Sequence, residues 1–133
     1  MTSRIAVIQM VSSRDVDVSL ARAGELIEDA ASRKVEAIYL PENFAALASD
    51  DPRAIGDGEA GGHGPIRSFL KEISSATGCW IFAGTLPTSR RPDGSPVPDG
   101  RVRAASIVYD ANGMEVARYD KIHMFDVDVD DNQ

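Results

Sequence analysis

The sequence has one cysteine, Cys79, among its 133 residues. A single cysteine cannot form an internal disulfide, and this sparing use of cysteine fits a reducing compartment. No apolar run approaches the roughly 20 residues that a membrane-spanning helix needs. The N-terminus enters the run RIAVIQM without the pattern of a secretory signal. These absences predict a soluble, cytoplasmic protein.

Positive charge is also scarce. There are 14 Lys and Arg residues against 21 Asp and Glu residues, which gives a formal net charge of −7 at pH 7. A polyanionic surface would repel such a chain, so we expect neither nucleic acid nor a membrane as a partner. With 43% hydrophobic residues, the sequence has enough apolar material for the core of one domain.

Short apolar runs rich in β-branched residues predict three strands. They are residues 4–10, 35–40 and 79–87. Between the first two runs, apolar residues recur at spacings of three and four. This spacing predicts a helix to about Arg33, with Asp15 or Asp17 as the cap of its first turn. Because strand, helix and strand follow one another, we expect the first two strands to pair in parallel.

The rest of the chain mixes regular elements with turn-rich segments. The segment after PENF, up to residue 64, is rich in glycine and predicts a loop without regular structure. A second helix is expected from Pro65 to Gly78. Residues 87–100 contain four prolines, which predicts an exposed excursion. Strands near 102–109 and 114–121 then form a predicted hairpin around DANG. The order of elements predicts an α/β fold.

Two charged residues follow predicted strands and are candidates for catalysis. Glu42 comes directly after the second strand, in LPENF, where open α/β sheets place reactive groups. Pro41 stiffens the backbone that leads to it. Lys121 ends the last strand, in ARYDKIHMF, and could donate to a developing oxyanion while a carboxylate moves protons. From spacing alone, a surface carboxylate and an exposed lysine on an edge strand remain the alternatives.

Other motifs predict no site. The aspartates of DVDVDD alternate as in an EF-hand loop, but Asp131 stands where that loop needs glycine, so we expect no metal. His123, two residues after Lys121, is expected to form structural hydrogen bonds. The triplet GCW around Cys79 lacks the flanking pattern of a papain-like site, which predicts a buried structural thiol. The glycines around His63 lack the Lys-Ser or Lys-Thr pair of a phosphate loop.

Four segments together resemble the N-terminal half of the nitrilase superfamily of carbon-nitrogen hydrolases, especially its amidase-like Nit branch. They are RIAVIQM, AIYLPENF, CWIFAGTLP and NGMEVARYDKIHMFDVDV, in this order and spacing. The resemblance implies the N-terminal half of a nitrilase-type α-β-β-α sandwich, homodimers or larger assemblies in the full-length form, and no cofactor or metal. It also implies hydrolysis of the non-peptide C–N bond of a small-molecule amide or nitrile through a Glu-Lys-Cys triad and an acyl-enzyme. Glu42 would be the general base, and Lys121 would stabilise the tetrahedral intermediate.

The cysteine of that triad has no counterpart in this sequence. In the family it lies well downstream of the lysine, and Cys79 differs in both position and context. We therefore expect residues 1–133 to be a carbon-nitrogen hydrolase domain truncated before the catalytic cysteine and inactive alone. The alternative is a noncatalytic half-domain that binds full-length relatives or assembles with them. The sequence also departs from the family at VRAAS, residues 102–106, where many relatives carry a Tyr-Asn pair.

Overall fold

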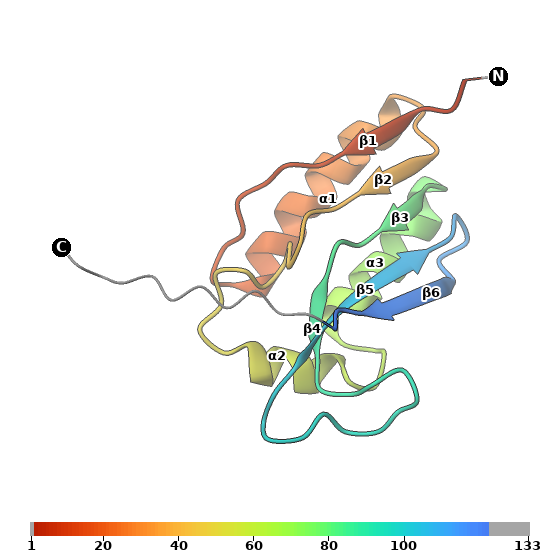
Figure 1. Ribbon diagram of the computed structural model, residues 1–133. Helices are drawn as coiled ribbons and strands as arrows, with labels where there is room; N and C mark the ends of the chain where they lie inside the picture. Colours follow the sequence, from red (N-terminus) through yellow and green to blue (C-terminus); the bar gives the residue numbers. More distant parts are fainter. Residues whose placement is uncertain (1, 123–133) are drawn as a thin grey trace.

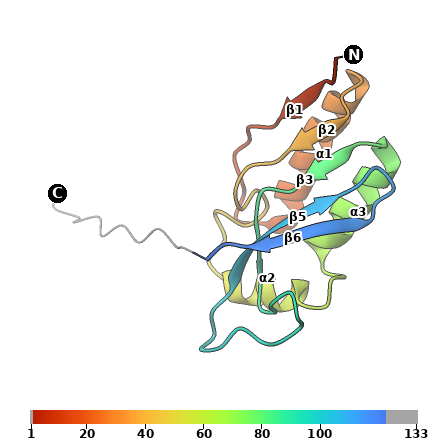
Figure 2. The ribbon, with the colours of Figure 1, turned by 45° about the vertical axis from the view of Figure 1, so that its right-hand side comes forward.

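The computed structural model describes residues 2–122. Six strands form one mixed sheet, and helices α1 and α3 lie on the same side of it (Figure 1, Figure 2). The strand order is β1-β2-β3-β5-β4, and β6 pairs with the other edge of β5. This arrangement confirms the α/β fold expected from the sequence.

Strands β1 to β4 have three residues each, and β5 and β6 are longer. Their bounds are β1 Ile5–Val7, β2 Ala37–Tyr39, β3 Trp80–Phe82, β4 Leu86–Thr88, β5 Arg103–Tyr109 and β6 Glu115–Asp120. Strands β1, β2 and β3 pair in parallel, as expected for strands joined by helical crossovers. Strand β5 runs antiparallel to β3 and β4 on one edge and to β6 on the other, which confirms the predicted hairpin. The sheet therefore changes from parallel to antiparallel between β3 and β5.

Two helices match the periodicity of the sequence. Helix α1 (Val16–Ser32) begins at the cap Asp15, whose carboxylate accepts hydrogen bonds from the backbone N–H groups of Asp17 and Val18. Helix α3 (Pro65–Thr77) begins with a proline and ends at Gly78, whose φ of 65° is left-handed. The buried faces of both helices join the core that covers the sheet. This core includes Ala23, Ile27, Ile38, Ile66, Leu70, Ile81 and Ile107.

The predicted loop between residues 45 and 64 contains a helix, α2 (Pro52–Glu59), so that prediction was wrong. The Asp51 side chain accepts a hydrogen bond from the Ala54 N–H at 2.9 Å, and Pro52 fits the first turn. Gly56 lies against the strand region that follows β4: a Cβ here would lie 3.3 Å from the Ser89 nitrogen. The glycine that suggested a loop therefore lets a helix approach the sheet closely.

Two further expectations need correction. The predicted strand over residues 79–87 is interrupted, because Gly84 adopts a left-handed φ of 60° between β3 and β4. The proline-rich segment 87–100 is only partly exposed. Thr88, Ser89 and Val97 are buried, and Arg90 forms a β-bridge with Pro96. Among the described residues, none of the three helices has the length and apolar character to cross a membrane.

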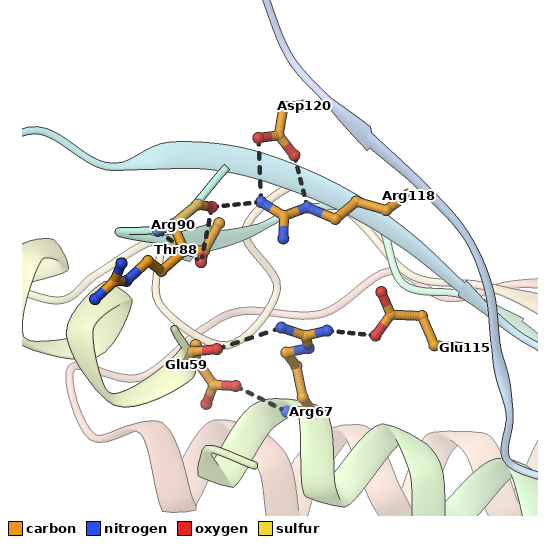
Figure 3. A network of polar contacts seen from close by, with 7 residues as sticks. All are labelled: Glu59, Arg67, Thr88, Arg90, Glu115, Arg118 and Asp120. Carbon is orange, nitrogen blue, oxygen red and sulfur yellow. Dashed lines mark hydrogen bonds and ion pairs between the residues drawn. The ribbon is translucent and has the colours of Figure 1, made fainter. Parts of the chain in front are cut away.

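A buried carboxylate joins α2, α3 and β6 (Figure 3). Glu59 is fully buried and accepts hydrogen bonds from the backbone N–H groups of Ile66, at 2.7 Å, and Arg67, at 3.1 Å. The Arg67 guanidinium forms an ion pair with Glu115 at the start of β6. Burial raises the pKa of Glu59 despite these hydrogen bonds, since removal from water disfavours the charged form. The network ties the helical layer to the edge strand β6.

We predict that Glu59→Gln destabilises the fold by about 1–3 kcal/mol, because one of the two backbone N–H groups loses its acceptor inside the core. The pKa of Glu59 is higher in the folded than in the unfolded chain, so folding takes up a proton between the two values. The contribution of Glu59 to the free energy of unfolding is therefore fully present below its pKa in the unfolded chain. This contribution is lost as the pH rises through its pKa in the folded chain.

The measurement is urea unfolding of both proteins across this pH range. The free energy of unfolding of the wild type, minus that of Glu59→Gln, should fall as the pH rises. Glu28→Gln, at an exposed position on α1, is the matched control and should change neither stability nor slope. A difference that stays constant with pH would contradict the assignment of the shift to Glu59.

Candidate active site

Glu42 lies where the chain leaves β2, and hydrogen bonds hold the backbone on both sides of it. The Leu40 N–H donates to the Phe82 carbonyl of β3 at 2.9 Å. The Asn43 N–H donates to Thr85 Oγ1, also at 2.9 Å, and Asn43 adopts a left-handed φ of 50°. The next residue, Phe44, is completely buried. The backbone that carries Glu42 is therefore fixed between the sheet and the core.

Gly84 makes this position of Glu42 possible. Its φ is 60°, and a Cβ at this residue would lie 2.0 Å from the Pro41 carbonyl oxygen and 2.7 Å from that of Leu40. Only glycine fits so close to two backbone oxygens. The backbone at the break between β3 and β4 therefore packs directly against the backbone that follows β2.

Lys121 reaches the same place from β6, at the same end of the sheet but on the far side of β3 and β5. Its backbone N–H donates to the Ala104 carbonyl at 2.9 Å, which continues the β5–β6 ladder by one residue. Its ammonium donates to Glu42 Oε1 at 2.8 Å, although the two residues are 79 positions apart in the sequence. The Lys121 side chain is 41% exposed and that of Glu42 is 62% exposed, so the pair is open to a ligand.

A cavity of about 310 Å³ contains this ion pair. Besides Glu42 and Lys121, it is lined by Gly84, Thr85, Ala104, Ser106 and Tyr119. Tyr119 lines the cavity because side chains alternate along a strand. It lies two positions before Lys121, so both point to the same face, and it lies opposite Ser106 of β5. A second depression of about 220 Å³ shares Glu42, Thr85 and Ala104 with the first. A carboxylate that can accept a proton and an ammonium that can donate one thus face the same space.

The structure brings together the two residues selected from the sequence, and it adds others. Gly84, Thr85 and Tyr119 were not singled out; the spacing of Tyr119 from Lys121 was the one available signal. Cys79 is buried, and its thiol donates to the Val35 carbonyl at 3.4 Å, which confirms the prediction of a structural thiol. His63 is exposed and does not line the cavity.

His123 and the aspartates of DVDVDD lie outside the described residues. Within residues 2–122, no group of three or more His, Cys, Asp or Glu side chains could hold a metal ion. The candidate site is therefore built from Glu42, Lys121 and the uncharged residues around them.

The sequence matches the family model described as carbon-nitrogen hydrolase over residues 4–133. The chain belongs to this family, the nitrilase superfamily. It is 33% identical over 132 residues to a deaminated glutathione amidase from Yersinia enterocolitica, a match that covers 97% of this chain and 43% of the amidase. It is 29% identical over 128 residues to a chloroplastic omega-amidase from Arabidopsis thaliana, covering 94% of this chain and 32% of that protein.

Solved structures confirm the fold of this carbon-nitrogen hydrolase chain. The NitFhit protein of C. elegans superposes with a TM-score of 0.72 at 25% identity, over 99% of this chain and 31% of that protein. Nit3 of Saccharomyces cerevisiae gives a TM-score of 0.74 at 23% identity, over 91% of this chain and 44% of Nit3. The chain thus adopts part of the nitrilase fold and spans less than half the length of these relatives.

We predict that Gly84→Ala destabilises the protein much more than Gly94→Ala. Both glycines have left-handed φ values, 60° and 84°, but nothing lies within 4 Å of a Cβ at residue 94. Gly94→Ala should cost about 1–2 kcal/mol for the backbone conformation alone. Gly84→Ala should lose at least about 1–3 kcal/mol more, because backbone atoms must move.

Urea unfolding monitored by circular dichroism measures both effects. A Gly84→Ala variant that does not fold at all agrees with the prediction. Equal losses of stability in the two variants would mean that the contact with Pro41 is easily relieved, and that Glu42 does not depend on it.

Proposed function

We propose that this chain provides the general base, Glu42, and the oxyanion-stabilising lysine, Lys121, of a carbon-nitrogen hydrolase that acts on non-peptide C–N bonds of small amides or nitriles. The observation that supports this most directly is the 2.8 Å contact between the Lys121 ammonium and the Glu42 carboxylate in an open cavity. Membership of the carbon-nitrogen hydrolase family supports the reaction class.

The chemistry of the pair fits hydrolysis through an acyl-enzyme. Glu42 would take the proton of a cysteine thiol as the sulfur attacks the amide carbon, and Lys121 would donate to the oxygen that becomes negative. Glu42 would next pass the proton to the leaving amine, and then activate the water that cleaves the thioester. Each step needs the carboxylate and the ammonium near the reacting carbon, and the two groups face the same cavity.

The nucleophile would come from outside these 133 residues, because Cys79 is buried and bonded to a carbonyl away from the cavity. We therefore propose that the chain is inactive alone. From the family resemblance, we also propose that the complete enzyme is a homodimer or larger. Small amides are favoured as substrates, since the relatives include proteins named deaminated glutathione amidase and omega-amidase. The proposal requires no cofactor, no nucleic acid and no membrane.

The alternative, a noncatalytic partner of full-length relatives, is supported by the sheet face that α1 and α3 leave open. Val7 is 77% exposed, Trp80 is 42% exposed, and Tyr39 stacks on Phe82 with ring centroids 4.3 Å apart. Exposed apolar side chains of this kind often mark an interface. A half-domain could use this face to join another protein.

We predict that the purified 133-residue chain releases no ammonia from small amides, because a base and an oxyanion stabiliser without a nucleophile cannot form an acyl-enzyme. Ammonia release from a panel of aliphatic and carboxylated amides is the measurement. Turnover that Glu42→Gln abolishes would contradict the inactivity of the chain and would leave the role of Glu42 standing.

In a protein that contains this chain together with a downstream cysteine, Glu42→Gln and Lys121→Met should each lower kcat by a factor of about 10² or more. Glu28→Gln and Lys71→Met change the same residue types at exposed helical positions and should leave kcat unchanged. If such a protein has activity that survives both active-site substitutions, the proposed function is wrong. If sequencing beyond codon 133 finds no cysteine, the half-domain alternative is favoured.

A further inference from the structure

Lys121 lies at the end of an edge strand, where backbone pairing alone is a weak constraint. Among the described residues, β6 pairs with β5 alone, and the last bond of this ladder runs from the Lys121 N–H to the Ala104 carbonyl. Strand ends with few contacts open most easily. The Lys121 ammonium nevertheless meets the Glu42 carboxylate at 2.8 Å. We therefore looked for a further contact that holds this end of β6.

An ion pair on the opposite face of β6 supplies that contact (Figure 3). The Arg118 guanidinium donates from Nε to Asp120 Oδ1 at 2.8 Å and from Nη2 to Asp120 Oδ2 at 3.1 Å. Both side chains are only 12% exposed, whereas every other ion pair within residues 2–122 has a partner that is at least 31% exposed. A shielded pair with two parallel hydrogen bonds holds both partners in one orientation.

The segment that follows β4 anchors this ion pair. Arg118 Nη2 also donates to the Arg90 carbonyl at 2.6 Å (Figure 3). The preceding residue, Ser89, is buried. Its N–H donates to the Gly56 carbonyl of α2, and its carbonyl accepts from the Val97 N–H. Arg118 therefore ties the end of β6 to a part of the chain that is itself bonded to helix α2.

Strand geometry passes this constraint from Asp120 to Lys121. Side chains alternate along a strand, so Asp120 faces Arg118 while Lys121 faces the cavity. Without Arg118, the Asp120 carboxylate has no other hydrogen bond within residues 2–122. A shielded charge without a partner is costly, so the carboxylate would turn toward water. The peptide units beside Asp120 would turn with it and carry the Lys121 side chain away from Glu42.

We propose that Arg118 is a positioning residue of the candidate active site: through Asp120, it holds the end of β6 so that the Lys121 ammonium meets Glu42. The importance of this contact for hydrolysis rests on the proposed function. A lysine that stabilises an oxyanion acts mainly in the transition state, so its displacement lowers kcat more than it changes KM. Arg118 lies on the face opposite the cavity and acts through Lys121.

NMR spectroscopy of the purified chain tests the geometry. In the wild type, nuclear Overhauser effects should connect the Lys121 ε-methylene protons with the Glu42 side chain, and Arg118→Met should remove most of their intensity. Arg67→Met is the matched control, because it breaks the ion pair with Glu115 at the start of the same strand. Both substitutions should lower the free energy of unfolding, but Arg67→Met should leave the Lys121–Glu42 signal unchanged.

A second variant covers the case in which Arg118→Met does not fold. Arg118→Met combined with Asp120→Leu removes both charges, so no shielded charge is left without a partner and the fold is kept. This variant lacks the bond to the Arg90 carbonyl, and the Lys121–Glu42 signal should again fall. A signal of wild-type intensity in either folded variant, or an equal loss in Arg67→Met, would overturn the proposal.

Kinetics separate this inference from the proposed function. In an active protein that contains the chain and a downstream cysteine, Arg118→Met should lower kcat by a factor of about 10 to 10², with KM changed less than about threefold. Arg67→Met should leave kcat unchanged at a temperature where both variants are folded. If Arg118→Met also leaves kcat unchanged, the inference fails and the hydrolase stands. If no such protein hydrolyses an amide while the NMR signal depends on Arg118, the hydrolase proposal fails and the geometric role of Arg118 stands.

Discussion

The contact of Gly84 with the backbone oxygens of Leu40 and Pro41 is the constraint on which the site depends. It joins the exit of β2 to the interruption between β3 and β4, and Glu42 follows directly. Hydrogen bonds at Leu40 and Asn43 complete the fixation. Because no side chain intervenes at this contact, the position of the backbone from which the Glu42 side chain extends is set by packing of backbone on backbone.

The two faces of β6 have separate roles. Arg118 and Asp120 point to one face, where they hold the segment around Arg90. Tyr119 and Lys121 alternate with them and line the cavity on the other face. An edge strand has ladder partners on one side only, and Arg67 ties its first residue, Glu115, to the helical layer. The edge strand that leads to Lys121 is thus held by ion pairs at its start and near its end.

Positive charge is not spread evenly over the surface, although the molecule as a whole is acidic. The helical surface carries paired charges such as Arg22 with Glu25 and Arg33 with Asp29. The segment from residue 91 to 103 instead holds three arginines, Arg91, Arg101 and Arg103, whose side chains form no hydrogen bond within residues 2–122 and lie near Lys121. The acidic composition predicts no large polyanionic partner, but it does not say where on the surface the positive charges gather.

The sequence by itself determined the fold class, the two longer helices and the hairpin, because apolar periodicity and end signals such as Asp15 and Gly78 act within a few residues. It also singled out Glu42 and Lys121. The sequence did not predict α2 or the break in the third strand, because the local preference of glycine for turns does not show what packs against it. Gly56 lets a helix pack closely on the sheet, and Gly84 lets a neighbouring backbone approach.

Only the tertiary structure decided that a carboxylate and an ammonium 79 residues apart lie within 2.8 Å, and that three arginines gather beside them. Such distances depend on strand order and register. These are properties of the packed sheet, which no short stretch of sequence specifies.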